Sequence, residues 1–176
     1  MQLNKYGIIL DTLTSIDLEL VRTWRNSDHV KENMKYRGYI DSTMQTKWFD
    51  ELNQKNNFYF VIKEKEVKIG LINLKEIDWE RGIAEAGIFI GEKEYLNSPS
   101  PLLATISIME FAFEELNLKV LKAKIASANL RAILYNESIG YKKAEIQEDE
   151  FHYYHVNHRQ FLEATKNIRA TLNKLK

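Results

Sequence analysis

The spacing of apolar and polar residues predicts a series of strands and helices. A short strand is expected at residues 6–10. Three longer strands, rich in aromatic and β-branched side chains, are expected at residues 57–64, 67–77 and 82–91. A short charged turn near Lys65 joins the first two of these longer strands. The first half of the sheet is therefore expected to be largely antiparallel.

Helical spacing of apolar residues predicts two helices before the longer strands, at residues 14–34 and 40–56, and either Asp41 or Ser42 is the expected N-cap of the second. The final segment is basic and amphipathic, and we expect it to cover a sheet edge or to mediate a homodimer. The remaining elements are expected as a helix at residues 101–117, a strand at 119–127, a helix at 129–140, strands at 141–147 and 150–161, and a helix at 162–176.

This order of elements predicts a mixed α/β (α+β) fold, with a mostly antiparallel central sheet flanked by helices and an extra C-terminal helix. Strands and helices do not alternate strictly, so a doubly wound parallel sheet is not expected. The 176 residues contain no repeat, linker or low-complexity tract. We therefore expect a single domain over residues 1–176, with a core at 1–161 and the extra helix at 162–176.

Composition then limits the classes of function. The formal net charge is 0, so no overall field favours nucleic acid or an anionic membrane as a partner. Cysteine is absent, which excludes disulfides, thiol nucleophiles and thiolate metal sites. The first apolar run is too short for a signal peptide and none reaches membrane-spanning length, so a cytoplasmic protein is expected. His152 and His158 would lie about 20 Å apart on one strand face, with His155 on the other, so no metal site is expected.

Three parts of the chain carry recognisable motifs, namely AEAGIFIG at residues 84–91, the opening stretches at residues 20–34 and 40–49, and a segment with Asn129, Ala132, Tyr135, Gly140 and Tyr141. Together with the order of elements, these motifs resemble the GCN5-related N-acetyltransferases (GNAT). AEAGIFIG resembles the strand that holds acetyl-CoA in that family, and the last segment resembles its pattern Asn-x-x-Ala-x-x-x-Tyr-x-x-x-Gly-Phe. The opening stretches resemble a sub-branch that acts on ribosomal-protein N-termini, spermidine and amino-sugar nucleotides, and most of all the last group.

This resemblance implies transfer of acetyl from acetyl-CoA to a primary amine by direct attack in a ternary complex. The amine must lose a proton, and the leaving thiolate must be protonated or hydrogen-bonded. Glu85 is the candidate base, because it lies in an otherwise apolar strand where partial burial favours proton uptake. The alternative is a solvent-facing strand residue. The resemblance places Tyr135 as the acid, since a phenol stays protonated at neutral pH; the alternative is a core aromatic residue.

The resemblance also implies where acetyl-CoA binds. A bulge at residues 88–91 is expected to free backbone N–H groups for the carbonyl oxygen and the pantetheine arm. The family's glycine-rich phosphate turn is replaced by LNSPSPLLA at residues 96–104, in which two prolines lack N–H groups. If Ser100 is the N-cap, the helix start can still hold the pyrophosphate; the alternative is that the prolines only fix the helix start. The predicted coenzyme-binding residues are Ile88, Phe89, Ile90, Ser98, Ser100, Leu102, Leu103, Ala104 and Asn129.

The acceptor is expected to be a small-molecule amine, with an amino-sugar nucleotide preferred and protein N-termini or polyamines as alternatives. An acidic turn at residues 145–150 would favour a polyamine, although a solvated turn is the simpler interpretation. A third alternative is a non-catalytic GNAT-fold binding module whose coenzyme loop has decayed. The predicted acceptor-binding residues are Arg25, Gln45, Trp48, Tyr153 and His155.

Overall fold

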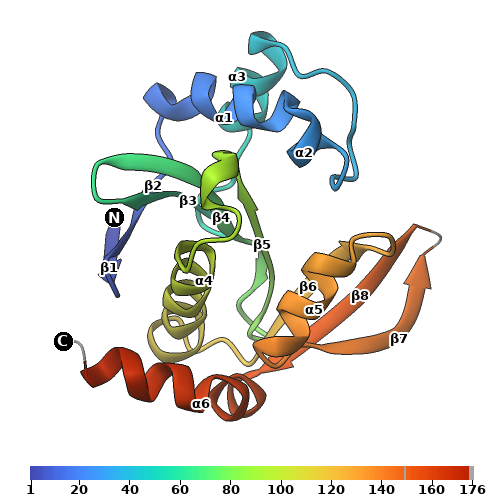
Figure 1. Ribbon diagram of the computed structural model, residues 1–176. Coiled ribbons are helices and arrows are strands. Elements are labelled where there is room, and N and C mark those ends of the chain that lie inside the picture. The colour runs from blue at the N-terminus through green and yellow to red at the C-terminus, as the bar shows by residue number, and fades with distance from the viewer. Residues whose placement is uncertain (149, 175–176) are drawn as a thin grey trace.

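A computed structural model, which describes residues 1–148 and 150–174, contains one mixed sheet flanked by helices (Figure 1). The strands follow the order β1-β2-β3-β4-β5-β6-β8-β7, and within the described residues every neighbouring pair is antiparallel except β5 with β6. This confirms the expected fold class. The strands are β1 (Gln2–Lys5), β2 (Ile8–Thr12), β3 (Phe58–Glu64), β4 (Val67–Asp78), β5 (Ile83–Ile90), β6 (Val120–Ala126), β7 (Lys142–Glu148) and β8 (Phe151–Asn157).

Two groups of helices cover the two faces of the sheet, and each group buries its own apolar cluster. Side chains of α1 and α3 pack on one face, and those of α4, α5 and α6 pack on the other. The helices are α1 (Leu18–Asn26), α2 (Asp28–Lys31), α3 (Ser42–Asp50), α4 (Ser100–Glu110), α5 (Leu130–Ser138) and α6 (His158–Lys174), with short 3-10 turns at Ser15–Asp17 and Lys93–Tyr95 and a π-helical turn at Phe111–Glu115.

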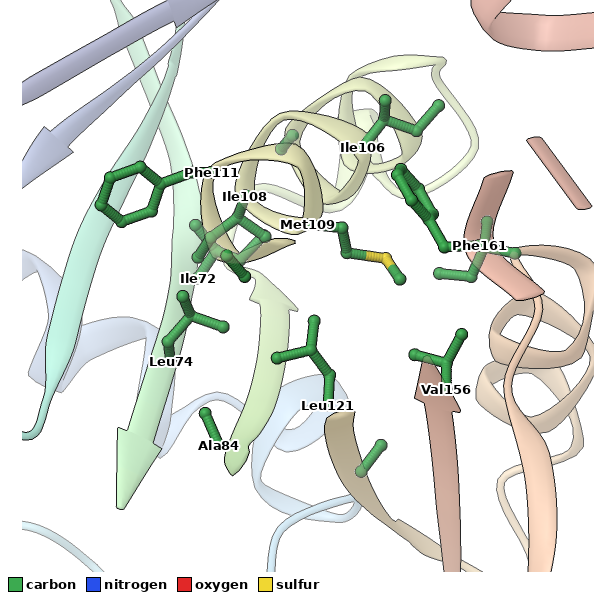
Figure 2. Packing of buried hydrophobic residues seen from close by; sticks show 14 of the residues in the cluster. Ile72, Leu74, Ala84, Ile106, Ile108, Met109, Phe111, Leu121, Val156 and Phe161 are labelled. Carbon is green, nitrogen blue, oxygen red and sulfur yellow. The ribbon is translucent and has the colours of Figure 1, made fainter. Parts of the chain in front are cut away.

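Alternation along the central strands assigns side chains to these two clusters. On β4, Leu71 belongs to the cluster under α1, whereas Ile72 and Leu74 belong to the cluster under α4. Figure 2 shows Met109 of α4 projecting into this second cluster, near Leu121 of β6. A sheet that is buried on both faces explains why its strands read as nearly continuous apolar runs in the sequence.

The N-terminal elements differ from the prediction in two places. The strand expected at residues 6–10 is instead a hairpin, β1–β2, whose turn is made by Tyr6 and Gly7 with φ of 59° and 76°. Gly7 suits such a turn, but tyrosine rarely takes a positive φ, so the hairpin was not predicted. The helix expected at residues 14–34 is broken at Ser27, where the backbone is extended with ψ of 143°.

Other helix ends also shift by several residues. The helix expected at residues 40–56 ends at Asp50, although Asp41 is its cap as predicted, since its carboxylate accepts from Met44 N at 2.8 Å. The α-helical part of the segment at 101–117 stops at Glu110 and continues as the π-helical turn. The last helix begins at His158, before the start expected at residue 162.

The sheet opens between β5 and β6, where a bulge had been expected. These parallel strands pair only at Ile83–Val120, Ala84–Leu121 and Glu85–Lys122, and diverge beyond that point (Figure 1). β5 stays in unbroken register with β4 from residue 85 to 90, so it has no bulge there, and the amides of Gly91 and Glu92 both donate to the Ile69 carbonyl just beyond its end. The irregularity lies in β4, between Lys75 and Asp78. Divergence of a parallel pair therefore frees the edge of β5, without the bulge that was expected within residues 88–90.

Candidate active site

A groove with a volume of about 2040 Å³ follows the opening between β5 and β6 and extends under α1, α2 and α3. Pockets for a single small ligand usually measure about 300–1,000 Å³, so this groove has room for two substrates. It brings together most of the predicted site residues, namely Arg25, Gln45, Trp48, Glu85, Ile88, Phe89, Ile90, Ser98, Leu102, Asn129, Tyr135, Tyr153 and His155. Three predicted residues do not line it, namely Ser100, Leu103 and Ala104.

Glu85 points from β5 toward the face covered by α1 and α3, opposite Lys75 on β4. Lys75 Nζ lies 2.9 Å from Glu85 Oε1, and the glutamate side chain is 27% exposed. Burial disfavours the charge of Lys75, but the hydrogen bond and the charge of Glu85 outweigh it, so the pKa of Lys75 is raised. The carboxylate therefore has a fixed cationic partner and still reaches the groove.

Tyr135 projects from α5 toward the first turns of α4. Its hydroxyl lies 3.0 Å from the Pro101 carbonyl oxygen and 2.7 Å from Thr105 Oγ1. A carbonyl can only accept, so the phenol donates to Pro101 and the Thr105 hydroxyl donates to the phenol. Burial raises the pKa of Tyr135 to about 12, although the Thr105 hydrogen bond lowers it in part. Tyr135 thus stays protonated and is oriented by two partners on α4.

The free edge of β5 supplies the backbone donors. Gly91 N donates to the Ile69 carbonyl on β4 at 2.9 Å, so the amides of Ile88 and Ile90 turn away from β4 and into the opening. Only one of the carbonyls on this edge has a described side-chain partner: Ile90 O lies 3.2 Å from His29 Nε2. The side chains of Ile88 and Ile90 pack in the cluster under α4, so it is their backbone that faces the groove.

The proline-containing loop differs from the expected phosphate site. Pro99 is the N-cap, since its carbonyl accepts from Leu103 N at 3.0 Å, and Ser100 is already helical, so the prediction of a Ser100 cap is wrong. The Ser100 hydroxyl donates to Glu64 Oε2 at 2.6 Å, and the Ser98 hydroxyl donates to the Tyr95 carbonyl at 2.9 Å. Both hydroxyls are thus committed to protein acceptors.

A cation that the sequence prediction missed lies beside this loop. Arg131 of α5 donates through Nη2 to the Leu96 carbonyl and to Asn97 Oδ1, the latter at 3.1 Å. Asn129 caps the same helix, because its Oδ1 accepts from Ala132 N at 3.0 Å. The Leu102 N–H in the first turn of α4 and the Arg131 guanidinium are therefore the groups that could hold a pyrophosphate here. The groove and these donors fit coenzyme A.

The part of the groove beside α1, α2 and β4 holds polar atoms with no partner. Arg25 Nη1, His29 Nδ1 and Asn73 Oδ1 are each buried without a hydrogen bond to any described residue. The preceding residue, Trp24, places Arg25. The Trp24 ring lies so close over Gly91 that a Cβ on this glycine would overlap the ring, and Trp24 Nε1 donates to Glu92 Oε1 at 2.8 Å. Buried polar atoms normally have partners, so these three atoms indicate a place for a ligand.

The far wall of the groove comes from β6 and β8. Lys124 Nζ donates to Tyr153 Oη at 2.7 Å and lies 5.2 Å from the centre of the Phe151 ring. His155 is exposed and pairs across the sheet with Lys122. Both predicted residues of this wall therefore border the groove beside lysines. The side chains of residues 146–149, in the acidic turn noted in the sequence, lie outside the part of the chain that the structure describes.

Within residues 1–148 and 150–174, no three histidine, aspartate or glutamate side chains gather where they could bind a metal ion. No helix of this part combines the length and the apolar character needed to cross a membrane.

Comparison with known proteins identifies the family. A family model for the acetyltransferase (GNAT) domain matches residues 10–161. The chain is 28% identical over 146 residues to acetyltransferase PseH of Campylobacter jejuni subsp. jejuni serotype O:23/36 (strain 81-176), covering 82% of this chain and 87% of the relative.

Solved structures share the fold. Spermidine N-acetyltransferase from Vibrio cholerae, in complex with CoA and spermine, superposes with a TM-score of 0.81 at 17% identity, over 89% of this chain and 98% of that one. Apo FdhC, a nucleotide-linked sugar GNAT, superposes with a TM-score of 0.80 at 19% identity, over 98% of each chain. The chain therefore belongs to the GNAT acetyltransferases, the family expected from its sequence, and is an N-acetyltransferase that uses acetyl-CoA.

Proposed function

We propose that this chain transfers the acetyl group of acetyl-CoA to the amino group of an amino-sugar nucleotide. The observation that carries the proposal is the guanidinium of Arg25, whose buried Nη1 has no partner among the described residues. Burial lowers the pKa of Arg25, and no described carboxylate pairs with it. The diphosphate of a sugar nucleotide is the kind of anion that a guanidinium binds best.

Charge along the groove supports an anionic acceptor over a polyamine. The described lining residues include six with positive and three with negative side chains, a net charge of +3. Such a surface attracts phosphates and repels a polyamine, which carries several positive charges itself. The six cations are Arg25, Lys35, Lys75, Lys122, Lys124 and Arg131, and the three anions are Glu32, Glu76 and Glu85.

Fold similarity alone does not choose between the acceptors. The fold is shared both with a nucleotide-linked sugar GNAT and with a spermidine N-acetyltransferase. A site must therefore be argued from its own residues. The unpaired Arg25 and the cationic lining favour the sugar nucleotide, with protein N-termini as the second candidate. A binding module without activity is disfavoured, because Glu85, Tyr135 and the free edge of β5 all face one groove.

Each part of the reaction has a candidate group in this groove. Acetyl-CoA supplies an activated acyl group in the form of a thioester. Glu85 accepts the proton that the amine loses during attack. The N–H groups of Ile88 and Ile90 donate to the acyl oxygen as it gains charge. Tyr135 donates a hydrogen bond to the sulfur as negative charge develops on it.

The first test is a panel of acceptors with acetyl-CoA. We expect the highest kcat/KM with an amino-sugar nucleotide, and a value at least about tenfold lower with the same amino sugar lacking the nucleotide, because a charge-assisted hydrogen bond is lost. Spermidine should be a poor acceptor. Equal rates with and without the nucleotide, or a preference for spermidine, would contradict the proposed acceptor. The measurement is the initial rate of coenzyme A release.

The second test is Arg25→Met, which keeps the apolar stem but removes the guanidinium. We expect KM for the sugar nucleotide to rise about tenfold, since one charge-assisted contact is lost, while the rate with the free amino sugar stays unchanged. The matched control is Arg81→Met, because Arg81 is 77% exposed and does not line the groove. If both variants bind the sugar nucleotide alike, Arg25 does not hold its phosphates.

A further inference from the structure

One polar side chain at the centre of the groove has no role so far. Asn73 lies in the middle of β4, paired with Tyr59 on β3 and Gly87 on β5. Its Oδ1 is buried and accepts no hydrogen bond from any described residue. A buried acceptor without a donor is costly in a folded protein, so a bound ligand is the natural source of the missing N–H or O–H group.

The neighbours of Asn73 place it at the reacting centre. Lys75 and Glu85 pair across β4 and β5 on the same face of the sheet. They lie two residues further along the strands than Asn73, which is about 7 Å at the usual rise per residue. A Cβ on Gly87 would meet the two polar atoms of the Asn73 amide at 3.3 and 3.4 Å, so the amide lies over Gly87. The next residue of β5, Ile88, turns its amide into the opening. Asn73 thus lies between the candidate base and a donor for the acyl oxygen.

We propose that Asn73 holds the attacking nitrogen, with Oδ1 accepting a hydrogen bond from the neutral amine. This inference rests on the proposed acetyl transfer to an amine, but it applies to any amine acceptor. A bond from one N–H to Oδ1 fixes the direction of the nitrogen lone pair, which is how positioning residues raise a rate. The amide oxygen is too weak a base to take the proton, which passes to Glu85.

The bond changes balance with these assignments. The nitrogen lone pair forms the new C–N bond. The C–S bond breaks and leaves its electron pair on sulfur, which receives the hydrogen bond of Tyr135 and departs as the thiolate. The positive charge that the nitrogen acquires is removed when its proton moves to Glu85. Asn73 keeps its own atoms and charge throughout, so it is a substrate-binding group in the reaction.

Two replacements of similar size test this role. Asn73→Leu removes both polar atoms, and Asn73→Asp keeps an oxygen at the same place. We expect Asn73→Leu to lower kcat about tenfold or more with KM for acetyl-CoA unchanged, and Asn73→Asp to retain more activity than Asn73→Leu. A packing role predicts the opposite order, because leucine is tolerated in an apolar site and a buried carboxylate is not.

The control and the outcomes separate this inference from the proposed acceptor. Asn167→Leu makes the same change on the exposed side of α6, and thermal unfolding of all variants checks their folding. Wild-type kcat in Asn73→Leu, or more activity in Asn73→Leu than in Asn73→Asp, would overturn the inference. If the wild type prefers spermidine, the sugar-nucleotide assignment fails. The loss in Asn73→Leu is then still expected with spermidine as the acceptor.

Discussion

Phenylalanine in place of Tyr135 is expected to lower kcat by about 100-fold, the loss seen when one donor to developing charge is removed. KM for both substrates should change little, because the phenol contributes only as charge builds up on sulfur. The measurement is a steady-state comparison of Tyr135→Phe with the wild type. A change in kcat of less than about threefold would leave Tyr135 as a core aromatic residue.

The pKa values indicate how Tyr135 acts on the sulfur. Burial raises the pKa of Tyr135 to about 12, whereas the thiol of cysteine has a pKa of about 8.5. The phenol therefore cannot hand its proton fully to the thiolate, and it acts as a hydrogen-bond donor. To do so it must exchange its bond to the Pro101 carbonyl for one to sulfur, while Thr105 continues to donate to it. The pKa also means that activity should not fall through tyrosine ionisation below about pH 10.

A matched control separates this role from packing. Tyr95 is also partly buried against the core and does not line the groove, so Tyr95→Phe should keep wild-type kcat. Tyr135→Phe leaves the Thr105 hydroxyl without its acceptor, so some loss of stability is expected as well. Thermal unfolding measured beside kcat distinguishes the two effects. A loss of activity that only parallels a loss of folded protein would argue against a chemical role.

Periodicity in the sequence was enough to predict the central strands and the fold class. Residues 58–64, 67–78 and 83–90 form long apolar strands because helices cover both of their faces. The errors occur where a single residue takes an unusual backbone shape. Tyr6 adopts a positive φ, and Ser27 is extended between two short helices. Neither residue type signals that conformation, because local propensity is weak against tertiary packing.

A site residue was predicted where a local sequence pattern marked it. It was missed where only the pairing of strands or helices places it in the site. Glu85 stood out as a carboxylate in an apolar strand, and Asn73 in GLINLKEI offers the same signal in β4. Lys75 becomes a neighbour of Glu85 only through the β4–β5 pairing. Arg131 reaches the proline loop from a helix more than 30 residues away in the sequence. Contacts of this kind depend on the folded sheet and have no signal in the local sequence.

The two prolines have a structural role at the start of α4. Pro99 starts α4 by accepting the first helical hydrogen bond, and Pro101 fills a first-turn position whose N–H would be free in any case. The carbonyl of Pro101 accepts the hydroxyl of Tyr135. The loop, which contains no glycine, therefore also orients the candidate donor to sulfur. Arg131 places a positive charge beside it.

The largest expected effect on stability concerns Glu110, at the end of α4. Its side chain is only 4% exposed, yet it accepts from Tyr6 Oη at 2.8 Å, Arg169 Nε at 2.8 Å and Lys5 Nζ at 3.2 Å. These contacts join the β1–β2 turn and α6 to the helix that bears the groove. Glu110→Leu is expected to lower the free energy of unfolding by about 3 kcal/mol, because two cations and a phenol lose a buried partner. Urea unfolding monitored by circular dichroism measures it.

The pH dependence of the stability gives a second test of the role of Glu110. Burial raises the pKa of Glu110, but hydrogen bonds from Arg169, Tyr6 and Lys5 outweigh burial, so the net pKa is lowered. A carboxyl whose pKa is lower in the folded state stabilises the fold above the unfolded-state value, about 4.3, and loses that contribution as pH falls through the folded-state value. The difference between wild type and Glu110→Leu should be constant from about pH 5 to 8 and shrink in more acidic solution. Glu115→Gln is the control, since Glu115 Oε1 lies 4.0 Å from Lys5 Nζ and the Glu115 side chain is 52% exposed. Equal effects of the two variants would mean that the buried network does not hold α6 against α4.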